Sequence, residues 1–291
     1  MCEKDKPSNC DRPETFFPLN DELIRALRSY YTLHFLGAQS SRCTVSSTSR
    51  AIGAVTHQLR CRILPMPNLI LANITWLALS SSQAAFAVGT ATARRYVYGF
   101  PPVVGFANPS QPDFAGLERF CEVGENLYCG AWSGKVPGGW DLAADTFAHQ
   151  MVWRGKSPKN SSAMRVSRLG PGNLKEMHEL ILVTQPGPFC DRSLDLGDFY
   201  GVFVDGRLAA MVGERFQAGP LREISSVCTH PDFEGRGFAR HLIERLVREQ
   251  IERGQTPFLH VMDGNDRARF IYERMGFRKE SELPVRVIFR V

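Results

Sequence analysis

Apolar and polar residues alternate most clearly in the second half of the chain. The run "FYGVFVDGRLAAMVGERF", residues 199–216, has alternating segments on either side of Asp205-Gly206. This dipeptide is typical of a two-residue hairpin turn, so the run predicts two antiparallel strands. Further strands are expected in four segments with alternating or β-branched residues: 163–170, 222–230, 258–263 and 285–291.

Three other segments have the spacing of helices. Residues 174–181 carry an apolar face, as do residues 240–253, which Gly254 follows. Residues 266–275 are a shorter helix, and Gly276 stands where a helix commonly ends. The order β-α-β-β-β-α-β-α-β predicts an α/β or α+β domain with a mixed sheet.

The part of the chain before this domain has weaker patterns. Between Met66 and Trp153 we expect a helix through 76–89, a second helix near 113–123 and short strands that end in 145–153. The segment 154–162, "RGKSPKNSS", has the composition of a linker.

The chain is therefore expected to have three parts. Residues 1–65 are a poorly structured extension in which 21–36 is the only helix candidate, because the segment is rich in serine and lacks apolar periodicity. Residues 66–158 form a smaller α/β half, and residues 159–291 form the main domain.

Charge and cysteine spacing exclude several classes of protein. The 291 residues carry a net charge of +5, and Lys and Arg are spread along the chain, so nucleic acid is not an expected partner. Eight cysteines form no C-x-x-C pair and the histidines form no H-x-x-x-H, so no metal is expected. The cysteines are interpreted as reduced thiols of a cytoplasmic protein. The apolar stretch 60–87 is interrupted by Pro and Asn, so no membrane association is expected.

One loop carries candidate chemistry. In "THPDFEGRGFARHLIERL", residues 229–246, a strand leads through Gly235 and Gly237 into a helix. Backbone N–H groups and the helix dipole make such a loop suitable for an anion, and glycine lets the backbone approach a phosphate. The short "GRG" alone is equally compatible with a tight turn that binds nothing.

The loop and the later run "NDRARFIYERMGF", residues 265–277, together resemble the GNAT superfamily of coenzyme A-dependent N-acetyltransferases. The family patterns are Q/R-x-x-G-x-G/A and N-x-x-A-x-x-x-Y-x-x-x-G-F, and the resemblance covers about residues 163–291. Residues 66–153 resemble the half that precedes this domain in the branch related to glycine N-acyltransferases. The resemblance implies a GNAT-type mixed sheet with flanking helices, preceded by a smaller α/β half.

The resemblance also implies a binding site for acetyl-CoA as the acyl donor. Backbone groups of Val227, Cys228 and Thr229 would pair with the pantetheine arm. The backbone N–H groups that would hold the pyrophosphate belong to Gly235, Arg236, Gly237, Phe238, Ala239 and Arg240. Asn265 would contact the pantetheine or cap the following helix. Glu234 departs from the family's Gln or Arg and should face solvent, because a carboxylate repels phosphate.

Tyr272 matches the family tyrosine that stabilises or protonates the departing thiolate; the alternative is a tyrosine that only packs on its helix. Glu214 and Glu223 are the candidates for the base. If the hairpin turns about Ala218-Gly219, they lie opposite each other, and their proximity raises the pKa of one of them. A solvated pair at the sheet edge is the alternative.

The function expected is transfer of an acetyl group to a primary amine of a small molecule or peptide, by direct attack. Two other functions remain open at this point. One is a glycine N-acyltransferase-like enzyme that uses another acyl-CoA, and the other is a non-catalytic acyl-CoA-binding regulator.

Overall fold

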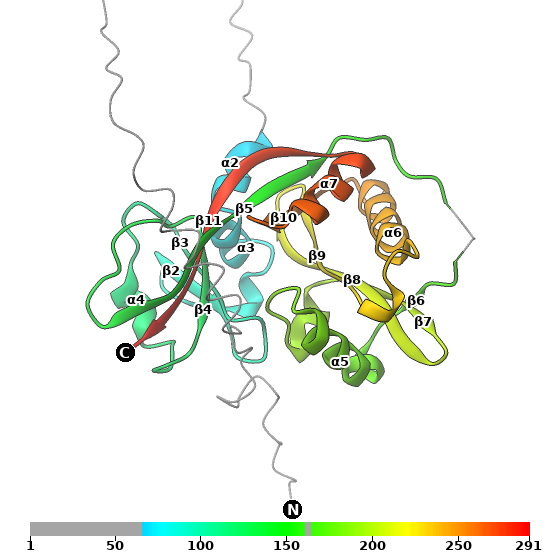
Figure 1. The fold of residues 1–291 in the computed structure, drawn as a ribbon. Helices are drawn as coiled ribbons and strands as arrows, with labels where there is room; N and C mark the ends of the chain where they lie inside the picture. The colour runs from blue at the N-terminus through cyan, green and yellow to red at the C-terminus, as the bar shows by residue number, and fades with distance from the viewer. Residues whose placement is uncertain (1–65, 161–163) are drawn as a thin grey trace, which may run out of the picture. The chain divides into compact units, whose positions relative to one another are not determined.

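A mixed sheet of eleven strands runs through residues 66–160 and 164–291, which are the residues that this computed structural model describes (Figure 1). The strands are β1 (Ala87–Gly89), β2 (Ala93–Tyr96), β3 (Val103–Phe106), β4 (Leu127–Gly130), β5 (Trp140–Trp153), β6 (Ser167–Arg168), β7 (Phe199–Val204), β8 (Arg207–Ala218), β9 (Leu221–Thr229), β10 (Thr256–Met262) and β11 (Phe277–Arg290). Their order across the sheet is β1-β2-β3-β4-β11-β5-β10-β9-β8-β7-β6.

The helices of the described residues are α2 (Met66–Ala72), α3 (Ile74–Ser80), α4 (Phe114–Glu118), α5 (Leu174–Thr184), α6 (Phe238–Glu252) and α7 (Asp266–Met275). Short 3-10 turns connect several elements: η2 (Ala84–Phe86), η3 (Pro171–Asn173), η4 (Asp191–Leu196) and η5 (Pro231–Phe233). The expected mixed α/β architecture with flanking helices is confirmed.

The last strand joins the two expected halves of the molecule. β11 pairs with β5 over nearly its whole length and also pairs with β4, so hydrogen bonding continues from one half into the other. Figure 1 shows β11 in red running beside the green β5. The expected boundary at residues 158/159 falls in the connection between β5 and β6 and stays a prediction.

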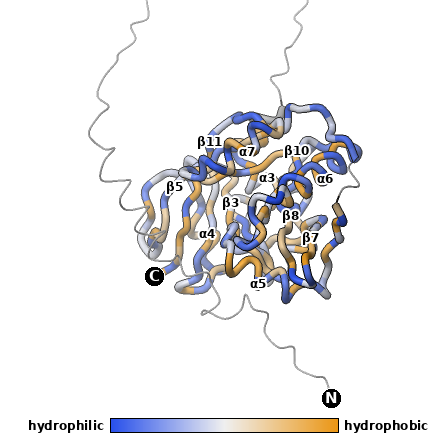
Figure 2. Tube along the Cα trace, turned by 45° about the vertical axis from the view of Figure 1, so that its right-hand side comes forward, coloured by the Kyte–Doolittle hydropathy of each residue, from blue (hydrophilic) through white to orange (hydrophobic). Residues whose placement is uncertain are grey.

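The two faces of the sheet are covered by different helices. Along β8, Ala210 and Val212 pack in the cluster that contains the apolar residues of α6, whereas Met211 packs with those of α5. Along β10, Leu259 packs with α6, whereas Phe258 packs with α2 and α3. Because side chains alternate along a strand, α6 and α7 cover one face, and α2, α3 and α5 cover the other. Figure 2 shows hydrophobic residues concentrated along the strands between these layers.

Several of the expected elements are confirmed. β7 and β8 pair as an antiparallel hairpin around Asp205 and Gly206, which both have positive φ. α7 has the predicted bounds, and α6 begins at Phe238, two residues before the predicted start.

The first half differs more from expectation. The helix predicted over 76–89 is wrong, because α3 ends at Ser80 and β1 follows at Ala87. The hydroxyls of Ser80 and Ser81 bond to carbonyls one turn back, which competes with the helix. The helix predicted near 113–123 is limited to α4, and the short strands predicted up to Trp153 are one short strand, β4, and one long strand, β5, which ends at Trp153. The helix candidate at 21–36 lies outside the described residues.

The cysteines differ in part from the expected set of reduced thiols. Cys121, Cys129 and Cys228 are free and buried, whereas Cys190 is disulfide-bonded. Disulfides are uncommon in cytosolic proteins, so the cytoplasmic location stays a prediction. Among the described helices, none has the length and apolar character needed to cross a bilayer.

Close packing of α3 on β3 gives a test of this fold. A Cβ added at Gly105 would lie 2.8 Å from the backbone nitrogen of Trp76, so Gly105→Ala should lower the free energy of unfolding by about 1–3 kcal/mol. The matched control is Gly138→Ala, where an added Cβ meets nothing within 4 Å. Urea denaturation of both variants measures the difference, and an equal effect of the two changes would contradict the packing.

Candidate active site

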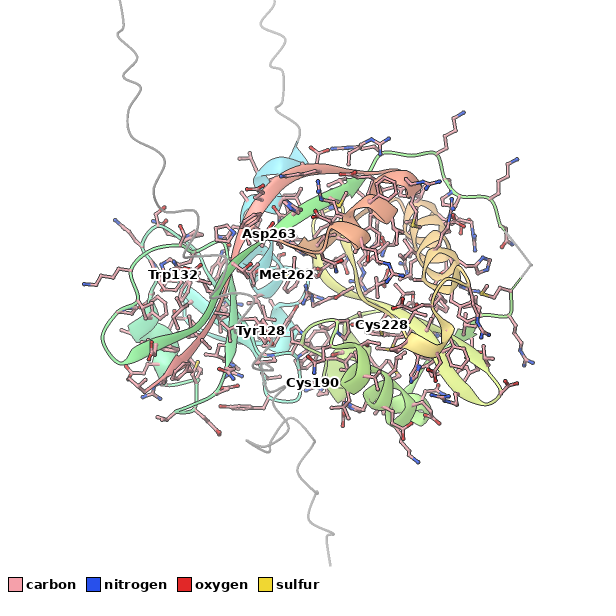
Figure 3. The ribbon with its side chains drawn as sticks, in the orientation of Figure 1. Tyr128, Trp132, Cys190, Cys228, Met262 and Asp263 are labelled. Atoms are coloured by element: carbon pink, nitrogen blue, oxygen red, sulfur yellow. The ribbon has the colours of Figure 1, made fainter. Side chains whose placement is uncertain are left out.

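Strands β9 and β10 are paired at one end and separate at the other. Their parallel register holds for only three pairs, Thr256 with Leu221, Pro257 with Arg222 and Phe258 with Glu223. Beyond these pairs β9 continues to Thr229 and β10 to Met262 without pairing to each other. We call this region, 224–229 of β9 and 259–262 of β10, the fork. Figure 3 labels Cys228, near the end of β9, and Met262, at the end of β10, which both lie on the open side of the fork.

A bulge in β9 turns the backbone at the fork. Between the pairs Met211–Cys228 and Gly213–Ser225, β8 has one residue and β9 has two, and Ser226 has a φ of 50°. This left-handed conformation is uncommon for serine and marks the bulge as a specific feature. Nothing in the residue sequence signalled it.

The bulge decides which backbone groups of β9 are free. The N–H of His230 donates to Ala209 O at 2.8 Å, and Cys228 lies opposite Met211. In an antiparallel ladder the backbone groups alternate in direction, so those of Cys228 point to β8 while those of Val227 and Thr229 point into the fork. Of the three residues expected to pair with a pantetheine arm, two therefore present free groups and Cys228 does not.

The glycine loop leaves its N–H groups free beside the fork. Gly235 and Gly237 have φ of 74° and 78°, and Gly237 is the N-cap of α6. From Gly235 to Arg240, no backbone N–H donates to an atom of the described residues. An added Cβ at either glycine would meet nothing within 4 Å. Free donors, open space and a helix N-terminus fit a diphosphate.

The acidic residue of the loop has a partner. Glu234 is about half exposed and lies 2.9 Å from the guanidinium of Arg267, in the first turn of α7. The prediction that Glu234 faces solvent is confirmed, and the pairing offsets part of its repulsion of an anion. Arg236 stacks on Phe233 at 5.1 Å and has no carboxylate partner in the described residues.

Tyr272 reaches the fork from α7. Its ring packs edge-on to Phe277 at 6.0 Å, within the cluster formed by α6 and the sheet. Burial raises the pKa of the phenol to about 12, and the nearby Cys228 thiol adds to the shift. Its hydroxyl makes no hydrogen bond to the described residues. The side chain is therefore a neutral, unpaired donor next to the end of β9.

Asn265 caps α7. Its side-chain oxygen accepts a hydrogen bond from Ala268 N at 3.1 Å. Of the two roles expected for this residue, the helix cap is confirmed, and contact with a coenzyme stays a prediction.

Glu223 lies at the closed end of the fork and all its acceptor positions are used. Arg215 donates two hydrogen bonds, of 2.9 and 2.7 Å, and His260 Nδ1 lies 2.7 Å from Oε1. The N–H of Phe216, exposed by a bulge in β8, donates to Oε2 at 3.2 Å. Although burial alone raises the pKa of Glu223, the Arg215 and His260 interactions outweigh it and hold the pKa far below its usual range.

Glu214 belongs to a separate cluster on the opposite face of the sheet. It pairs with Ile224, not Glu223, and its carboxylate accepts hydrogen bonds from Arg222, Gln250 and Arg253. The prediction that Glu214 and Glu223 share a face is wrong. The hairpin turns at Gly219-Pro220, one residue later than expected, which alone would leave the two side chains on one face. The bulge in β8 between Glu214 and Gln217 then shifts the register by one residue and places them on opposite faces.

The prediction that one of these carboxylates has a raised pKa is also wrong. Burial alone raises the pKa of Glu214, but the interactions with Arg222, Asp198 N–H and Gln250 lower it overall. Sequence reasoning missed these arginine partners. Arg215 directly follows Glu214 and Arg222 directly precedes Glu223, and neighbouring residues of a regular strand point to opposite faces of the sheet. With both glutamates expected on one face, both arginines were expected on the other.

Comparison with known proteins adds to this geometry. The model of the FR47-like protein family matches residues 199–286, which run from β7 into β11 and include both the loop and Tyr272. A crystal structure assigned to the GNAT family, from Novosphingobium aromaticivorans, is 31% identical with a TM-score of 0.71, over 76% of this chain and 98% of that one. The chain belongs to the GNAT family of acetyltransferases.

Other relatives match more distantly or over a shorter stretch. A GCN5-related N-acetyltransferase of Kribbella flavida has a TM-score of 0.52 at 14% identity, over 76% of this chain and 95% of that one, which shows the shared fold. An acetyltransferase of Yersinia enterocolitica is 41% identical over 56 residues, 19% of this chain. That match spans 39% of the Yersinia protein's length, so it identifies a shared segment and not a shared substrate.

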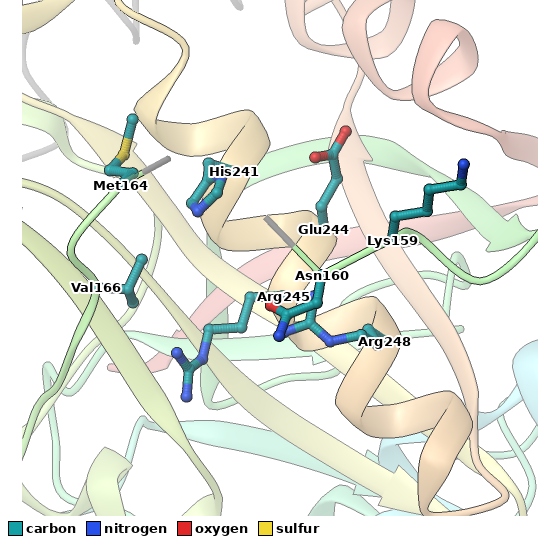
Figure 4. Close-up of a pocket in the computed structure, with 8 residues that line it drawn as sticks. All are labelled: Lys159, Asn160, Met164, Val166, His241, Glu244, Arg245 and Arg248. Atoms are coloured by element: carbon teal, nitrogen blue, oxygen red, sulfur yellow. The ribbon is translucent and has the colours of Figure 1, made fainter. Parts of the chain in front are cut away.

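A hollow lies along the polar side of α6 (Figure 4). Lys159, His241, Arg245 and Arg248 are among its lining residues. Arg245 and Arg248 are each paired with a glutamate one turn further along α6. Neither Tyr272 nor any residue of the fork lines this hollow, so it is distinct from the candidate site. No group of His, Cys, Asp and Glu within the described residues is arranged to hold a metal ion.

The position of Glu234 predicts an effect on coenzyme affinity. Glu234→Gln removes one negative charge beside the diphosphate site and releases Arg267, so the Kd for coenzyme A should fall about two- to fivefold at low salt. Isothermal titration calorimetry measures the change. Glu252→Gln, at the C-terminal end of α6, is the charge-matched control and should have no effect. Weaker binding by Glu234→Gln would contradict this placement of the diphosphate.

The buried cluster of Glu214 predicts how stability depends on pH. A carboxyl group whose pKa is lower in the folded than in the unfolded chain stabilises the fold at pH values above its unfolded pKa, here 4.5. This contribution is lost as the pH falls below that value. Glu214→Ala should lower the free energy of unfolding at pH 7 by about 3–5 kcal/mol, because Arg222 stays buried without its partner. The stability that this variant loses between pH 5 and 3, measured by urea unfolding, should be smaller than the stability that the wild type loses. The exposed Glu179→Ala is the control.

Proposed function

We propose that this chain transfers an acetyl group from acetyl-CoA to a primary amine by direct attack. The observation that carries the proposal is the fork. It has a row of unbonded N–H groups at Gly235–Arg240 on one side and the unpaired hydroxyl of Tyr272 on the other. Bound acetyl-CoA would supply an activated thioester there.

The chain would bind the acetyl donor through the donor's diphosphate and the amide groups of its pantetheine arm. The N–H groups of Gly235–Arg240 and the guanidinium of Arg236 would hold the diphosphate. The free groups of Val227 and Thr229 would pair with the amides of the pantetheine arm, as an added strand pairs with a sheet edge. The thioester would then lie deeper in the fork, toward Glu223 and Phe258.

Tyr272 would act on the departing sulfur. A thiol has a pKa of about 8.5, so the leaving thiolate is a weak base, and a phenol with a pKa of about 12 stays protonated beside it. The hydroxyl would therefore donate a hydrogen bond to the sulfur as negative charge develops. This stabilises the transition state without prior ionisation of the phenol.

Direct transfer is favoured over an acyl-cysteine route. Burial raises the pKa of the Cys228 thiol to about 12, so the nucleophilic thiolate is scarce near neutral pH. Its side chain also packs in the cluster on the α5 face, among Met211 and Leu180.

Two measurements test the proposal in sequence. Acetyl-CoA at a hundred times its Kd should raise the free energy of unfolding by about 2.7 kcal/mol. Thiol release should then exceed the hydrolysis rate with at least one member of a panel of amines. Absence of any stabilisation by the coenzyme would contradict binding. Stabilisation without thiol release from any amine would contradict the enzymatic function and favour a regulator.

Tyr272→Phe isolates the chemical role of the hydroxyl. The ring and its packing on Phe277 remain, so the Kd for acetyl-CoA should stay within about twofold, while kcat should fall about 100-fold or more. Pre-steady-state thiol release measures the chemical step. Tyr98→Phe, on the exposed surface of the other half, is the control. An unchanged kcat would remove Tyr272 from the mechanism.

A further inference from the structure

One ion pair spans the open end of the fork. Glu234 lies in the loop that follows β9, and Arg267 lies in the first turn of α7, which follows β10. Their side chains meet at 2.9 Å. Because β9 and β10 are parallel, both strands end on the same side of the sheet, so the pair joins the two chain segments that leave the fork. Among the described residues, no other ion pair or side-chain hydrogen bond joins this loop to α7.

The helix that carries Arg267 is weakly packed. α3, α4, α5 and α6 each bury at least two residues, whereas none of the ten residues of α7 is buried. It rests on the sheet through the partly buried Ala268, Tyr272 and Met275, while Phe270 is exposed. An element with few buried side chains opens at a lower free energy than the core around it. α7 can therefore shift without disrupting the packing of the sheet.

The two ends of α7 are held differently. At the C-terminal end, Gly276 O accepts from Arg154 N at 3.0 Å, and β11 begins directly afterwards. At the N-terminal end, a turn at Gly264 joins α7 to β10; this glycine has a φ of 84°, and an added Cβ would meet nothing within 4 Å. One backbone hydrogen bond, from Asn265 N to Met262 O, closes the turn. The N-terminal end, next to the ion pair, is therefore the end that can lift.

We propose that α7 is a lid over the bound coenzyme and that the Glu234–Arg267 ion pair is its latch. This inference rests on the proposed binding of acetyl-CoA in the fork. With the diphosphate at the glycine loop and the thioester deeper in the fork, the pantetheine arm enters past this ion pair. The pair opens to admit or release the coenzyme and, once closed again, holds the arm in the fork.

The lid also couples coenzyme binding to the chemistry. Tyr272 lies on α7, and its ring packs in the cluster formed by α6 and the sheet. Lifting the N-terminal end of α7 would draw the hydroxyl away from the sulfur of the thioester. The phenol is therefore in place to donate only while the latch is closed, so a coenzyme that is not yet held is not activated.

A simple charge effect would give a different result from a latch. If each side chain acted on the diphosphate alone, Glu234 would repel it and Arg267 would attract it. Glu234→Gln would then slow the release of the coenzyme, and Arg267→Gln would accelerate it. A latch is broken by the loss of either partner, so both substitutions should accelerate release.

The test measures the dissociation rate constant, koff, of etheno-coenzyme A, whose modified adenine is fluorescent, by stopped-flow displacement with excess coenzyme A. Glu234→Gln and Arg267→Gln should each raise koff about two- to fivefold, since an exposed ion pair contributes little. The double variant should match the single variants, because one latch is broken only once. In Glu234→Gln the association rate constant should rise by more than koff, because the repulsion of the diphosphate is also removed, so the affinity still increases.

The matched control is Arg269→Gln. Arg269 lies on the same helix but pairs with Asp266 and Glu273 of α7 itself, so its loss should leave koff unchanged. Hydrogen exchange in the chain without coenzyme gives a second measurement. The amides of 268–275 should exchange faster in both latch variants than in the wild type, whereas those of α6 should not change.

Other results would overturn the latch. Opposite effects of the two single substitutions on koff would identify two separate charge effects, and additive effects in the double variant would show that the side chains act independently. Unchanged exchange of α7 in both variants would show that the ion pair does not hold the helix. Each of these results leaves the proposed function intact if the wild type binds acetyl-CoA and releases thiol with an amine. Failure of the wild type to bind either coenzyme would contradict the proposed function, and the latch with it.

Discussion

The site depends on the separation of β9 and β10 after three residue pairs. Two parallel strands that part in the middle of a sheet leave N–H and C=O groups unbonded, which is costly unless another partner takes them. The separation is sustained because each strand keeps its other neighbour: β10 stays paired with β5 up to Met262, and β9 stays paired with β8 up to Thr229. The opening is therefore a stable feature of a rigid sheet.

The carboxylates nearest to this opening serve its architecture. Glu223 links β8, β9 and β10 through Arg215 and His260, and Gln150 extends the chain of hydrogen bonds to β5 and to α2. Polar groups buried at this depth are retained only where their partners are complete. The closed end of the fork is therefore fully bonded, whereas the free donors lie on the glycine loop and α7.

The half of the chain before the glycine loop is part of the same structure. β5 lies between β10 and β11, so the preceding half supplies a strand to the sheet that carries the site. Gln83 bonds to the carbonyl of Arg215 and to Tyr96, and so joins the bulge in β8 to β2. Such contacts make the position of Arg215, and with it Glu223, dependent on residues far away in sequence.

The sequence by itself determined the local features: the Asp205-Gly206 hairpin, the glycine loop before α6, the cap and bounds of α7, and the family to which they belong. These depend on residue types at short range, since turn conformation, helix periodicity and capping are set by a few neighbouring residues. Only the tertiary structure decided the faces on which Glu214 and Glu223 lie and the partners that hold them. The bulge in β8 after Glu214 shifts the strand register by one residue. A shift of one residue moves a side chain to the opposite face of a sheet, and no pattern in the sequence marks where a long-range pairing makes that shift.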